Sequence, residues 1–561
     1  MELRQPILYG VSMEYFNGEP LRHLADIVAM GAARYGEKTA FTSFGETLSY
    51  SGLERESNRV ANMLVEHGVE PGDRVALFVA NTNQFPEVYF GILKAGAVAV
   101  PLNLRMDSKT LVYVLRDSEA DHLVGTHLFA DEVRELAVAA EIRTLFLSGF
   151  GDEGAGIVDY SSAKAAHASE FDRPEQTHDD VACQLYTSGT TGRPKPAMLT
   201  HENLLATIEG TGRSGMSLDA DDSAVLVLPL FHIYALNTLM GTFLYRGATL
   251  HLQPKPDGEA ILSAIGEHRA TVFAGVPALF LMMWQAYREN PEGCDLSSLR
   301  YVICGAAPLA DETRRTIETA WNVPMVEGWG MTETAGSGAI EPVSGVRKSA
   351  GCVGPVLDPC EIKLVDPVTR ETRVSQTQLS PFPDPELDFE DEAATSGEIA
   401  VRGPNVFEGY QGRPETTAAA FDDEGFFYTG DVARVDRDGY LWIVDRVDDL
   451  IAVGGEKVYP AEVEAALYRH PGVEEAGVCG VPHDVKGEAP VAFVVPAEGS
   501  EVTERELRDF TLDHVGTYAN PGRVFLVDEL PRSATQKTQR YKLEEMADER
   551  LDGPLSSGGT L

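Results

Sequence analysis

The chain alternates between strand-like and helix-like patterns over two long stretches, residues 20–145 and 224–304. Five apolar residues, 75–79, follow Arg74, and residues 74–79 predict a buried strand. Residues 84–94 have the apolar spacing of a helix, and residues 95–101 predict the next strand. Strands joined through helices pair in parallel, because the helix returns the chain across the face of the sheet. The pattern therefore predicts parallel sheets covered by helices.

After about residue 350, short strands with glycine turns replace this alternation, and a compact last region begins at Asp448. Pro460 opens a predicted helix there, and His470-Pro471-Gly472 ends it. We predict an α/β fold in which a large N-terminal domain contains two parallel α/β subdomains and a β-rich subdomain. A small α+β C-terminal domain follows. The predicted segments are 1–447, 448–545 and a flexible tail, 546–561.

The charge is strongly acidic, with 87 Asp and Glu against 46 Lys and Arg, a net charge of −41. Such a chain repels nucleic acid and anionic membranes, so neither is expected as a partner. The acidic residues are spread along the whole chain, which resembles the cytoplasmic proteins of extreme halophiles. Any polyanionic substrate must then be met by local cations.

The sequence lacks an apolar run long enough to span a bilayer, and its first residues do not form a signal peptide. The six cysteines are scattered, without a Cys-x-x-Cys pair, which favours reduced and mostly buried thiols over a zinc site. We therefore expect a soluble cytoplasmic protein.

Residues 186–195, Tyr-Thr-Ser-Gly-Thr-Thr-Gly-Arg-Pro-Lys, combine four hydroxyls, two glycines and two cations. Glycines let backbone N–H groups approach an anion closely, while hydroxyls and cations satisfy its oxygens. The Gly-Lys-Ser/Thr ending of a Walker A loop is missing. The segment predicts a polyphosphate site of another kind.

Six further motifs follow in order along the chain. They lie at residues 228–236 (Leu-Pro-Leu-Phe-His-Ile-Tyr-Ala-Leu), 304–309 (Cys-Gly-Ala-Ala-Pro-Leu), 327–334 (Glu-Gly-Trp-Gly-Met-Thr-Glu-Thr), 428–431 (Tyr-Thr-Gly-Asp), 445–456 (Asp-Arg-Val-Asp-Asp-Leu-Ile-Ala-Val-Gly-Gly-Glu) and 531–537 (Pro-Arg-Ser-Ala-Thr-Gln-Lys). With these motifs the chain resembles the adenylate-forming acyl-CoA synthetases, a superfamily that includes firefly luciferase and peptide-synthetase adenylation domains. The resemblance covers roughly residues 20–545.

The resemblance implies a two-step reaction. The carboxylate of an acid attacks the α-phosphate of ATP to give an acyl-adenylate and pyrophosphate, and a thiol, usually that of coenzyme A, then displaces AMP. Carboxylate and ATP repel each other, so catalysis depends on positioning and charge neutralisation. The implied small molecules are ATP, Mg²⁺, coenzyme A and a carboxylic acid.

The resemblance also assigns roles to residues of the larger domain. A phosphate cradle is implied for Thr187, Ser188, Gly189, Thr190, Thr191, Gly192 and Lys195. Nucleotide contacts are implied for Gly305, Ala306, Ala307, Glu327, Gly328, Trp329, Asp431 and Arg446. Among these, Trp329 would stack on adenine and Asp431 would bind the ribose hydroxyls. Thr332 matches a residue that touches the α-phosphate, and Glu333 matches a Mg²⁺ ligand, as expected of a hard oxygen donor.

In the last domain, Lys537 matches the lysine that orients the carboxylate and neutralises the α-phosphate during adenylation. Gln536 stands where glycine is usual in the family. Asp448 matches a hinge about which this mobile domain rotates between the two steps, and Gly455 would then line a pantetheine tunnel. Such a rotation lets one site host two geometries.

The acid itself is less constrained. His232 would gate the acyl site or touch the carboxylate, although a structural histidine is almost equally compatible with the motif. Residues 231–237, Phe-His-Ile-Tyr-Ala-Leu-Asn, are similar to 4-coumarate-CoA ligases, whereas residues 454–464 are similar to medium- and long-chain fatty acyl synthetases. We favour a fatty acid, with an aromatic acid of the 4-coumarate type as the alternative. A non-catalytic AMP-binding protein is the alternative from another class, and it would be expected to lack Lys537 or Glu333.

Overall fold

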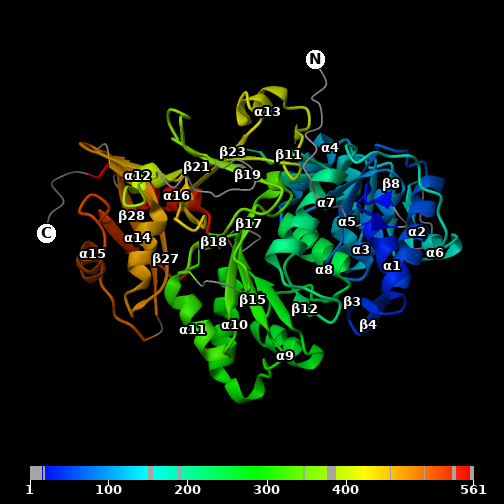
Figure 1. Cartoon of the computed structure of the whole chain (residues 1–561), viewed down its shortest axis with the longest axis horizontal. Coiled ribbons are helices and arrows are strands. Elements are labelled where there is room, and N and C mark those ends of the chain that lie inside the picture. Colours follow the sequence, from blue (N-terminus) through cyan, green and yellow to red (C-terminus); the bar gives the residue numbers. More distant parts are fainter. Residues whose placement is uncertain are drawn as a thin grey trace.

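The computed structural model is shown in Figure 1, and the last part of the chain forms a separate lobe at its left. The residues that it describes are 15–16, 19–148, 156–187, 193–307, 309–344, 348–375, 387–454, 456–497, 499–532, 538–551 and 553–555. Within these ranges, none of the helices is long and apolar enough to cross a membrane.

The first sheet has eight strands in the order β22-β11-β10-β6-β5-β7-β8-β9. Its strands are β5 (Arg74–Phe78), β6 (Val98–Pro101), β7 (His122–Gly125), β8 (Thr144–Leu147), β9 (Ile157–Val158), β10 (Val181–Thr187), β11 (Lys195–Thr200) and β22 (Gly409–Tyr410). The strands from β10 to β9 pair in parallel, whereas β11 and β22 pair antiparallel at one edge.

Helices cover both faces of this sheet, because alternate residues of β5 enter two different cores. Val75 and Leu77 pack in the main core, which also contains residues of α2 and α3. Ala76 and Phe78 pack in a second core with residues of α4 and α5. The helices of this region are α2 (Tyr50–Glu66), α3 (Gln84–Lys94), α4 (Ser108–Asp117), η1 (His127–Phe129), α5 (Ala130–Ala140) and α6 (Tyr160–Ala166).

The second sheet also has eight strands, in the order β17-β16-β15-β14-β12-β13-β3-β4. They are β3 (Thr39–Ser43), β4 (Glu46–Ser49), β12 (Ser223–Leu226), β13 (Thr249–Leu252), β14 (Val272–Gly275), β15 (Tyr301–Gly305), β16 (Met325–Trp329) and β17 (Ala339–Ile340). The strands pair in parallel except β4 and β17 at the two edges. The helical segments before and between these strands are α1 (Asp26–Tyr35), α7 (His201–Gly210), η2 (Thr211–Gly215), η3 (Tyr234–Gly241), α8 (Thr242–Arg246), α9 (Gly258–His268), α10 (Pro277–Glu289), η4 (Pro291–Gly293) and α11 (Asp311–Trp321).

The third sheet is antiparallel, with its six strands in the order β18-β24-β23-β21-β19-β20. They are β18 (Cys352–Gly354), β19 (Glu361–Val365), β20 (Thr372–Ser375), β21 (Ser396–Arg402), β23 (Phe427–Val435) and β24 (Leu441–Arg446). The short helices α12 (Glu392–Thr395) and α13 (Pro414–Ala420) belong to this part of the chain, and a two-stranded ribbon, β1 (Tyr15–Phe16) and β2 (Glu19–Pro20), lies near the N-terminus. The predicted α/β fold class, with two largely parallel sheets and a β-rich part, is confirmed.

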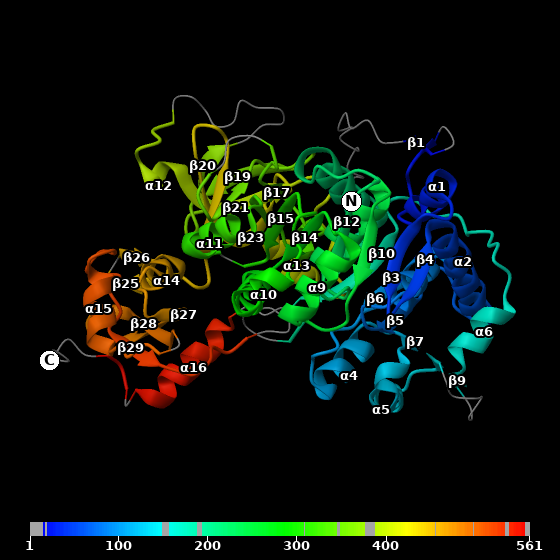
Figure 2. The same ribbon diagram turned by 90° about the horizontal axis from the view of Figure 1, so that it is seen from below.

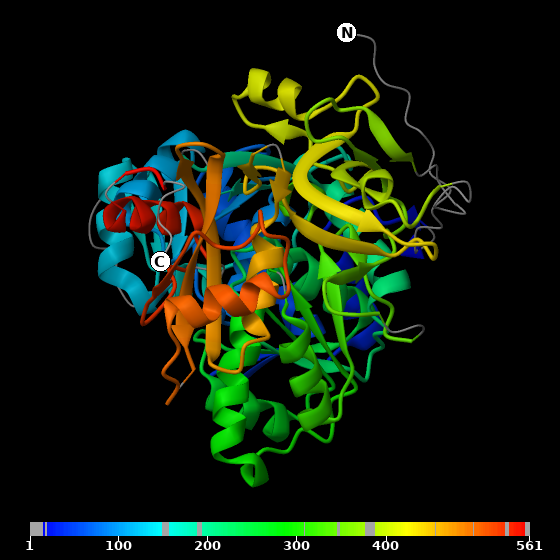
Figure 3. The same ribbon diagram turned by 90° about the vertical axis from the view of Figure 1, so that its left-hand side faces the viewer.

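The lobe at the left of Figures 1 and 2 is the predicted α+β C-terminal domain, which Figure 3 shows with its orange strands in front. It contains β25 (Ile451–Val453), β26 (Glu456–Val458), α14 (Pro460–Tyr468), β27 (Val473–His483), β28 (Gly487–Pro496), α15 (Glu504–Leu512), β29 (Arg523–Leu526) and α16 (Arg540–Arg550). Helix α16 runs past residue 545, where the sequence predicted the start of a flexible tail, and Ala547 is buried in the core of the lobe. Leu543 and Ala547 lie one turn apart and pack together on the sheet, which holds the helix in place on both sides of residue 545.

Candidate active site

Three sheets contribute to the candidate site. Gly305 and Trp329 end the parallel strands β15 and β16, and the carboxyl ends of parallel strands are where open α/β sheets bind ligands. Asp431 and Arg446 face each other across β23 and β24 of the antiparallel sheet. Thr187 and Lys195 are cross-strand partners on β10 and β11 of the first sheet. The fold thus brings together residues that are up to 259 positions apart, counted from Thr187 to Arg446.

Trp329 and Asp431 join the second sheet to the third. The indole Nε1 of Trp329 donates a hydrogen bond of 2.8 Å to Oδ2 of Asp431. Arg446 approaches the other carboxylate oxygen, with Nη1 at 3.2 Å from Oδ1. A carboxylate offers about four lone-pair sites, so each oxygen of Asp431 can accept one more hydrogen bond. The arrangement fixes the tryptophan ring beside an acceptor suited to hydroxyl groups.

Glu333 lies in η5 (Thr332–Thr334), the short turn that follows β16, and only 5% of it is exposed. The hydroxyl of Tyr410 donates a hydrogen bond of 2.9 Å to its Oε1. Burial raises the pKa of Glu333, since the carboxylate loses water, while the bond from Tyr410 opposes this shift. A buried carboxylate of this kind is a hard oxygen donor that fits a Mg²⁺ ion, because a cation would relieve the unfavourable buried charge. Thr332 is half-buried beside it.

Lys195 lies close to the same group. Its Nζ is 5.6 Å from the ring centroid of Tyr410, within the range of a cation–π contact. The hydroxyl of Thr187 donates a long hydrogen bond of 3.5 Å to the carbonyl of Lys195. Lys195, Tyr410 and Glu333 therefore form a continuous row from the strand after the phosphate segment to the predicted metal ligand.

The turn after β15 carries an uncommon backbone conformation. Ala306 has φ +67°, a left-handed value that a residue with a side chain adopts at a cost of about 1 kcal/mol or more. Such strain is concentrated at functional sites. Ala306 is exposed and Ala307 is half-buried, and Gly305 pairs with Gly328 in the adjacent strand. The turn thus presents backbone close to the end of β16.

Glu327 is placed differently from its neighbours in the motif. Its carboxylate is buried, pairs with Arg314 of α11 at 2.9 Å, and accepts the backbone N–H of Gly351 at 3.1 Å. Arg314 also pairs with Glu341 at 2.9 Å, so one guanidinium holds two buried carboxylates. Burial raises the pKa of Glu327 to about 8, although the charge of Arg314 opposes the shift. The side chain therefore anchors β16, and it holds Trp329 in place from the interior.

Tyr234 opens η3 and His232 lies two residues before it, and both are half-buried. The backbone N–H of Tyr234 approaches Nδ1 of His232 at 3.4 Å. The hydroxyl of Tyr234 points towards Gly305, because a Cβ added to that glycine would lie 3.5 Å from the hydroxyl oxygen. The motif that begins at Leu228 is thus adjacent to the turn after β15.

The remaining predicted residues lie outside the described residues. They are Ser188, Gly189, Thr190, Thr191, Gly192, Gly455 and Lys537. Their assigned roles stay predictions.

Sequence reasoning missed Tyr410 and Arg314. A signal for Tyr410 exists, since it follows Gly409 in a short aromatic run, Phe407-Glu408-Gly409-Tyr410, between two strands. Arg314 gives no such signal, because a cation on an amphipathic helix is usually solvated. Its structural role becomes visible only from its ion pairs with Glu327 of β16 and with Glu341, which follows β17.

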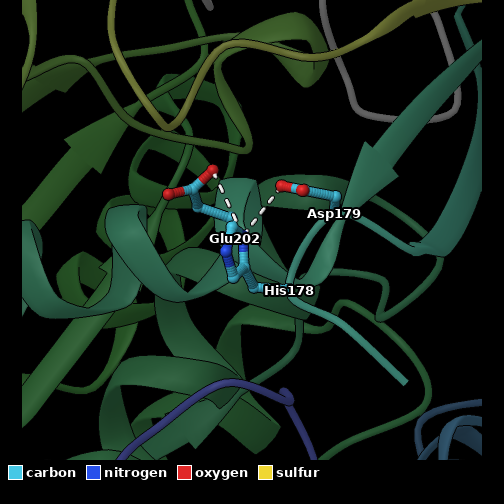
Figure 4. Close-up of side chains that lie close together, drawn as sticks. All are labelled: His178, Asp179 and Glu202. Carbon is cyan, nitrogen blue, oxygen red and sulfur yellow. Dashed lines mark ion pairs between the residues drawn. The ribbon is translucent and has the colours of Figure 1, made fainter. Parts of the chain in front are cut away.

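A separate group of possible metal ligands lies on the surface. Figure 4 shows His178, Asp179 and Glu202, whose ligand atoms all lie within 4.8 Å of one another. His178 Nδ1 is 2.8 Å from Asp179 and 3.7 Å from Glu202. His178 and Asp179 precede β10 and Glu202 follows β11, so the group lies at the opposite end of this strand pair from Thr187 and Lys195. A strand rises about 3.3 Å per residue, so the seven residues of β10 place the group about 20 Å from these two residues of the candidate site.

The chain is similar to known families and structures over most of its length. The sequence model of the family described as AMP-binding enzyme matches residues 28–411, and that of the AMP-binding enzyme C-terminal domain matches residues 462–537. A feruloyl-CoA synthase of Amycolatopsis sp. is 39% identical over 502 residues, which are 89% of this chain and 94% of that protein. A long-chain-fatty-acid–CoA ligase of Bacillus subtilis (strain 168) is 30% identical over 554 residues, 94% of this chain and 95% of that protein. The crystal structure of an anthranilate CoA ligase in complex with anthranoyl-AMP matches with a TM-score of 0.84 and 25% identity, covering 95% of this chain and 99% of that chain.

Proposed function

The chain belongs to the AMP-binding enzyme family, and from this premise we propose that it joins a hydroxylated aromatic acid of the hydroxycinnamate type to coenzyme A. It is an ATP-dependent, AMP-forming acid–thiol ligase. The preference for a fatty acid that we drew from the sequence is not confirmed. The relative that is 39% identical is named for feruloyl-CoA, a thioester of an aromatic acid.

Two buried hydroxyls on η3 carry the choice of acid. The hydroxyl oxygens of Tyr234 and Thr238 are both buried, and neither has a hydrogen-bond partner within the part of the chain that the structure describes. Tyr234 lies against Gly305, and Thr238 lies against Gly336, where a Cβ would approach its Oγ1 to 2.4 Å. An unsatisfied buried hydroxyl is unfavourable by about 1–3 kcal/mol. A phenolic substrate would satisfy these groups, whereas an alkyl chain would leave them unpaired.

A medium- or long-chain fatty acid is the second candidate. Its support is the 30% identity with the Bacillus subtilis long-chain-fatty-acid–CoA ligase over 94% of the chain. A phenolic acid would form hydrogen bonds with the hydroxyls of Tyr234 and Thr238, whereas a fatty acid would not, so an experiment can distinguish the two candidates.

We assign the steps of the reaction as follows. Trp329 and the turn at residues 305–307 hold adenine, and Asp431 accepts the ribose hydroxyls while Arg446 reaches the ribose or a phosphate. Residues 187–192 with Lys195 hold the β- and γ-phosphates, and Glu333 holds the Mg²⁺ that these ligases use. The ion, when bound, neutralises phosphate charge. Thr332, His232 and Lys537 then orient the α-phosphate and the attacking carboxylate.

We also propose that the C-terminal domain begins after residue 447 and rotates about Asp448. In the present pose, Arg540 of α16 pairs with Asp445 at the end of β24, at 3.5 Å, and with Glu464 of α14, at 2.9 Å. Asp445 precedes the proposed hinge and Glu464 follows it, so α16 is held to both sides of residue 448, which supports a domain junction there. A cytoplasmic location is supported by six cysteines that form no disulfide, five of them buried.

The test is a comparison of acids that differ in one hydroxyl. The enzyme is given ATP, Mg²⁺ and CoA with 4-coumarate, ferulate, cinnamate or decanoate, and AMP release is measured. We expect kcat/KM for 4-coumarate to exceed that for cinnamate by about tenfold, the worth of one good hydrogen bond. Tyr234→Phe should reduce this ratio. Tyr89→Phe is the matched control, since the hydroxyl of Tyr89 is also buried without a partner among the described residues, but lies on α3. Preference for decanoate over every aromatic acid would overturn the proposal in favour of the second candidate.

A further inference from the structure

The segment around Tyr410 connects the strand after the phosphate segment to the predicted metal ligand. On one side, the backbone N–H groups of Glu408 and Gln411 donate to the carbonyls of Met198 and Pro196, at 3.1 and 2.9 Å. On the other side, the N–H of Phe407 donates to the carbonyl of Glu333 at 2.9 Å. The main chain of this segment thus fixes the distance between β11 and η5.

A glycine makes this connection possible. Gly409 has φ +127°, which residues with side chains rarely adopt, and a Cβ there would lie 2.5 Å from the side chain of Thr417. The hydroxyl of Thr417 in turn accepts the backbone N–H of Tyr410 at 3.0 Å. The chain is therefore turned at Gly409 and held by Thr417, and the ring of Tyr410 is directed into the interior.

Tyr410 contacts both groups that the reaction assigns to the triphosphate. Its hydroxyl donates to Oε1 of Glu333 at 2.9 Å, and its ring faces Nζ of Lys195 at 5.6 Å from the centroid. Both Tyr410 and Glu333 are buried, with 9% and 5% of their surface exposed. A hydrogen bond to a buried charged acceptor is stronger than one to a neutral acceptor, so the phenol restricts the carboxylate to one orientation.

We propose that Tyr410 is a positioning residue that holds the Glu333 carboxylate in register with Lys195, so that both meet a divalent cation and the triphosphate of ATP. This inference rests on the proposed role of Glu333 as the metal ligand. The phenol engages one oxygen of Glu333 and contributes no charge of its own, so the carboxylate keeps its negative charge and further lone pairs for the cation. Partners that orient a metal ligand in this way typically change metal affinity 10–100-fold when they are removed.

The test uses the full-length enzyme with Mn²⁺ as the probe and a non-hydrolysable ATP analogue, and Mn²⁺ binding is followed by electron paramagnetic resonance. Tyr410→Phe keeps the ring that faces Lys195 and removes only the hydroxyl. We expect it to weaken Mn²⁺ binding in the ternary complex about tenfold, while the affinity for the analogue in EDTA is unchanged. The matched control is Tyr50→Phe, because the Tyr50 hydroxyl also makes a buried hydrogen bond, of 2.7 Å to the carbonyl of Ala248, but lies far along the chain in α2. It should bind Mn²⁺ as the wild type does.

Glu333→Gln distinguishes the role of Glu333 as metal ligand from the role of Tyr410 as positioning residue. If Glu333→Gln weakens Mn²⁺ binding and Tyr410→Phe does not, the positioning role is wrong while the metal ligand stands. If Tyr50→Phe weakens Mn²⁺ binding as much as Tyr410→Phe, the effect is one of general stability and the inference also fails. If Glu333→Gln binds Mn²⁺ like the wild type, the assignment of Glu333 as metal ligand fails, and the inference falls with it.

Discussion

Replacing Arg314 with methionine removes the positive charge between two buried carboxylates and keeps most of the side-chain volume. The Arg314 side chain is 3% exposed, and its guanidinium lies 2.9 Å from Glu327 and 2.9 Å from Glu341 and donates to the carbonyl of Met325 at 2.8 Å. The variant would remove the cation that the two carboxylates share and one donor to that carbonyl. Breaking a buried ion pair by removing one member typically destabilises a protein by about 3–5 kcal/mol. We expect a loss of that size at pH 8 and above.

A loss of about 3–5 kcal/mol in the free energy of unfolding should lower the melting temperature, Tm, by a readily measured amount. For a folding unit of 150–250 residues, 1 kcal/mol changes Tm by about 2–4 °C, so the expected decrease is about 6–20 °C. Differential scanning calorimetry is suitable because it resolves the transitions of separate domains, which a multidomain chain need not undergo together. Arg315→Met is the matched control on the same helix. The Arg315 side chain is 69% exposed and pairs with Asp311 of the same helix, so its loss should change stability by less than about 1 kcal/mol.

The pH dependence of the deficit gives the sharper test. Burial raises the pKa of Glu327 from 4.5 to about 8 in the native state, so the stability linked to this group is complete below pH 4.5 and is lost as the pH rises through about 8. Without Arg314 the pKa of Glu327 should rise further, because the charge of Arg314 lowers it. Protonated carboxyls need no counter-charge, so the deficit of Arg314→Met should be smaller at pH 5.5 than at pH 8. A deficit that equals that of Arg315→Met, or that is constant from pH 5.5 to pH 8, would refute this account.

Three further outcomes are expected. Asp431→Asn should raise the KM for ATP about tenfold with a small change in kcat, since the variant loses the ion pair with Arg446 and one acceptor for ribose. Steady-state kinetics at varied ATP concentration measures both constants, and an unchanged KM would contradict the prediction. Lys537→Ala should abolish adenylate formation and spare thioester formation from supplied acyl-adenylate, and an equal loss of both steps would refute the division of labour between domain poses. Activity should require high salt, because at 1 M the Debye length is about 3 Å and the repulsion between a chain of net charge −41 and ATP or CoA is screened; full activity in dilute buffer would be incompatible with this.

The local patterns of the sequence predicted individual elements closely. The helix predicted at residues 84–94 is α3 (Gln84–Lys94), and the strand predicted at residues 74–79 is β5 (Arg74–Phe78). These predictions succeed because periodic burial is a local property of the chain. Helix α16 continues to Arg550, past the boundary predicted at residue 545, and the packing of Leu543 and Ala547 on the sheet is not visible in the polar sequence around them.

The sequence by itself determined the fold class, the family and the nucleotide chemistry, because short motifs of glycines, hydroxyls and charged residues indicate which class of ligand a loop can bind. Only the tertiary structure decided how those residues are held. It paired Trp329 with Asp431, placed Glu327 in a buried ion network, and revealed Tyr410 and Arg314. It also placed two hydroxyls of η3 where no described residue satisfies them, which moved the proposed acid from a fatty acid to a phenolic one. The physical reason is that hydrogen bonds and ion pairs join residues far apart in the chain, and their partners exist only once three sheets have packed together.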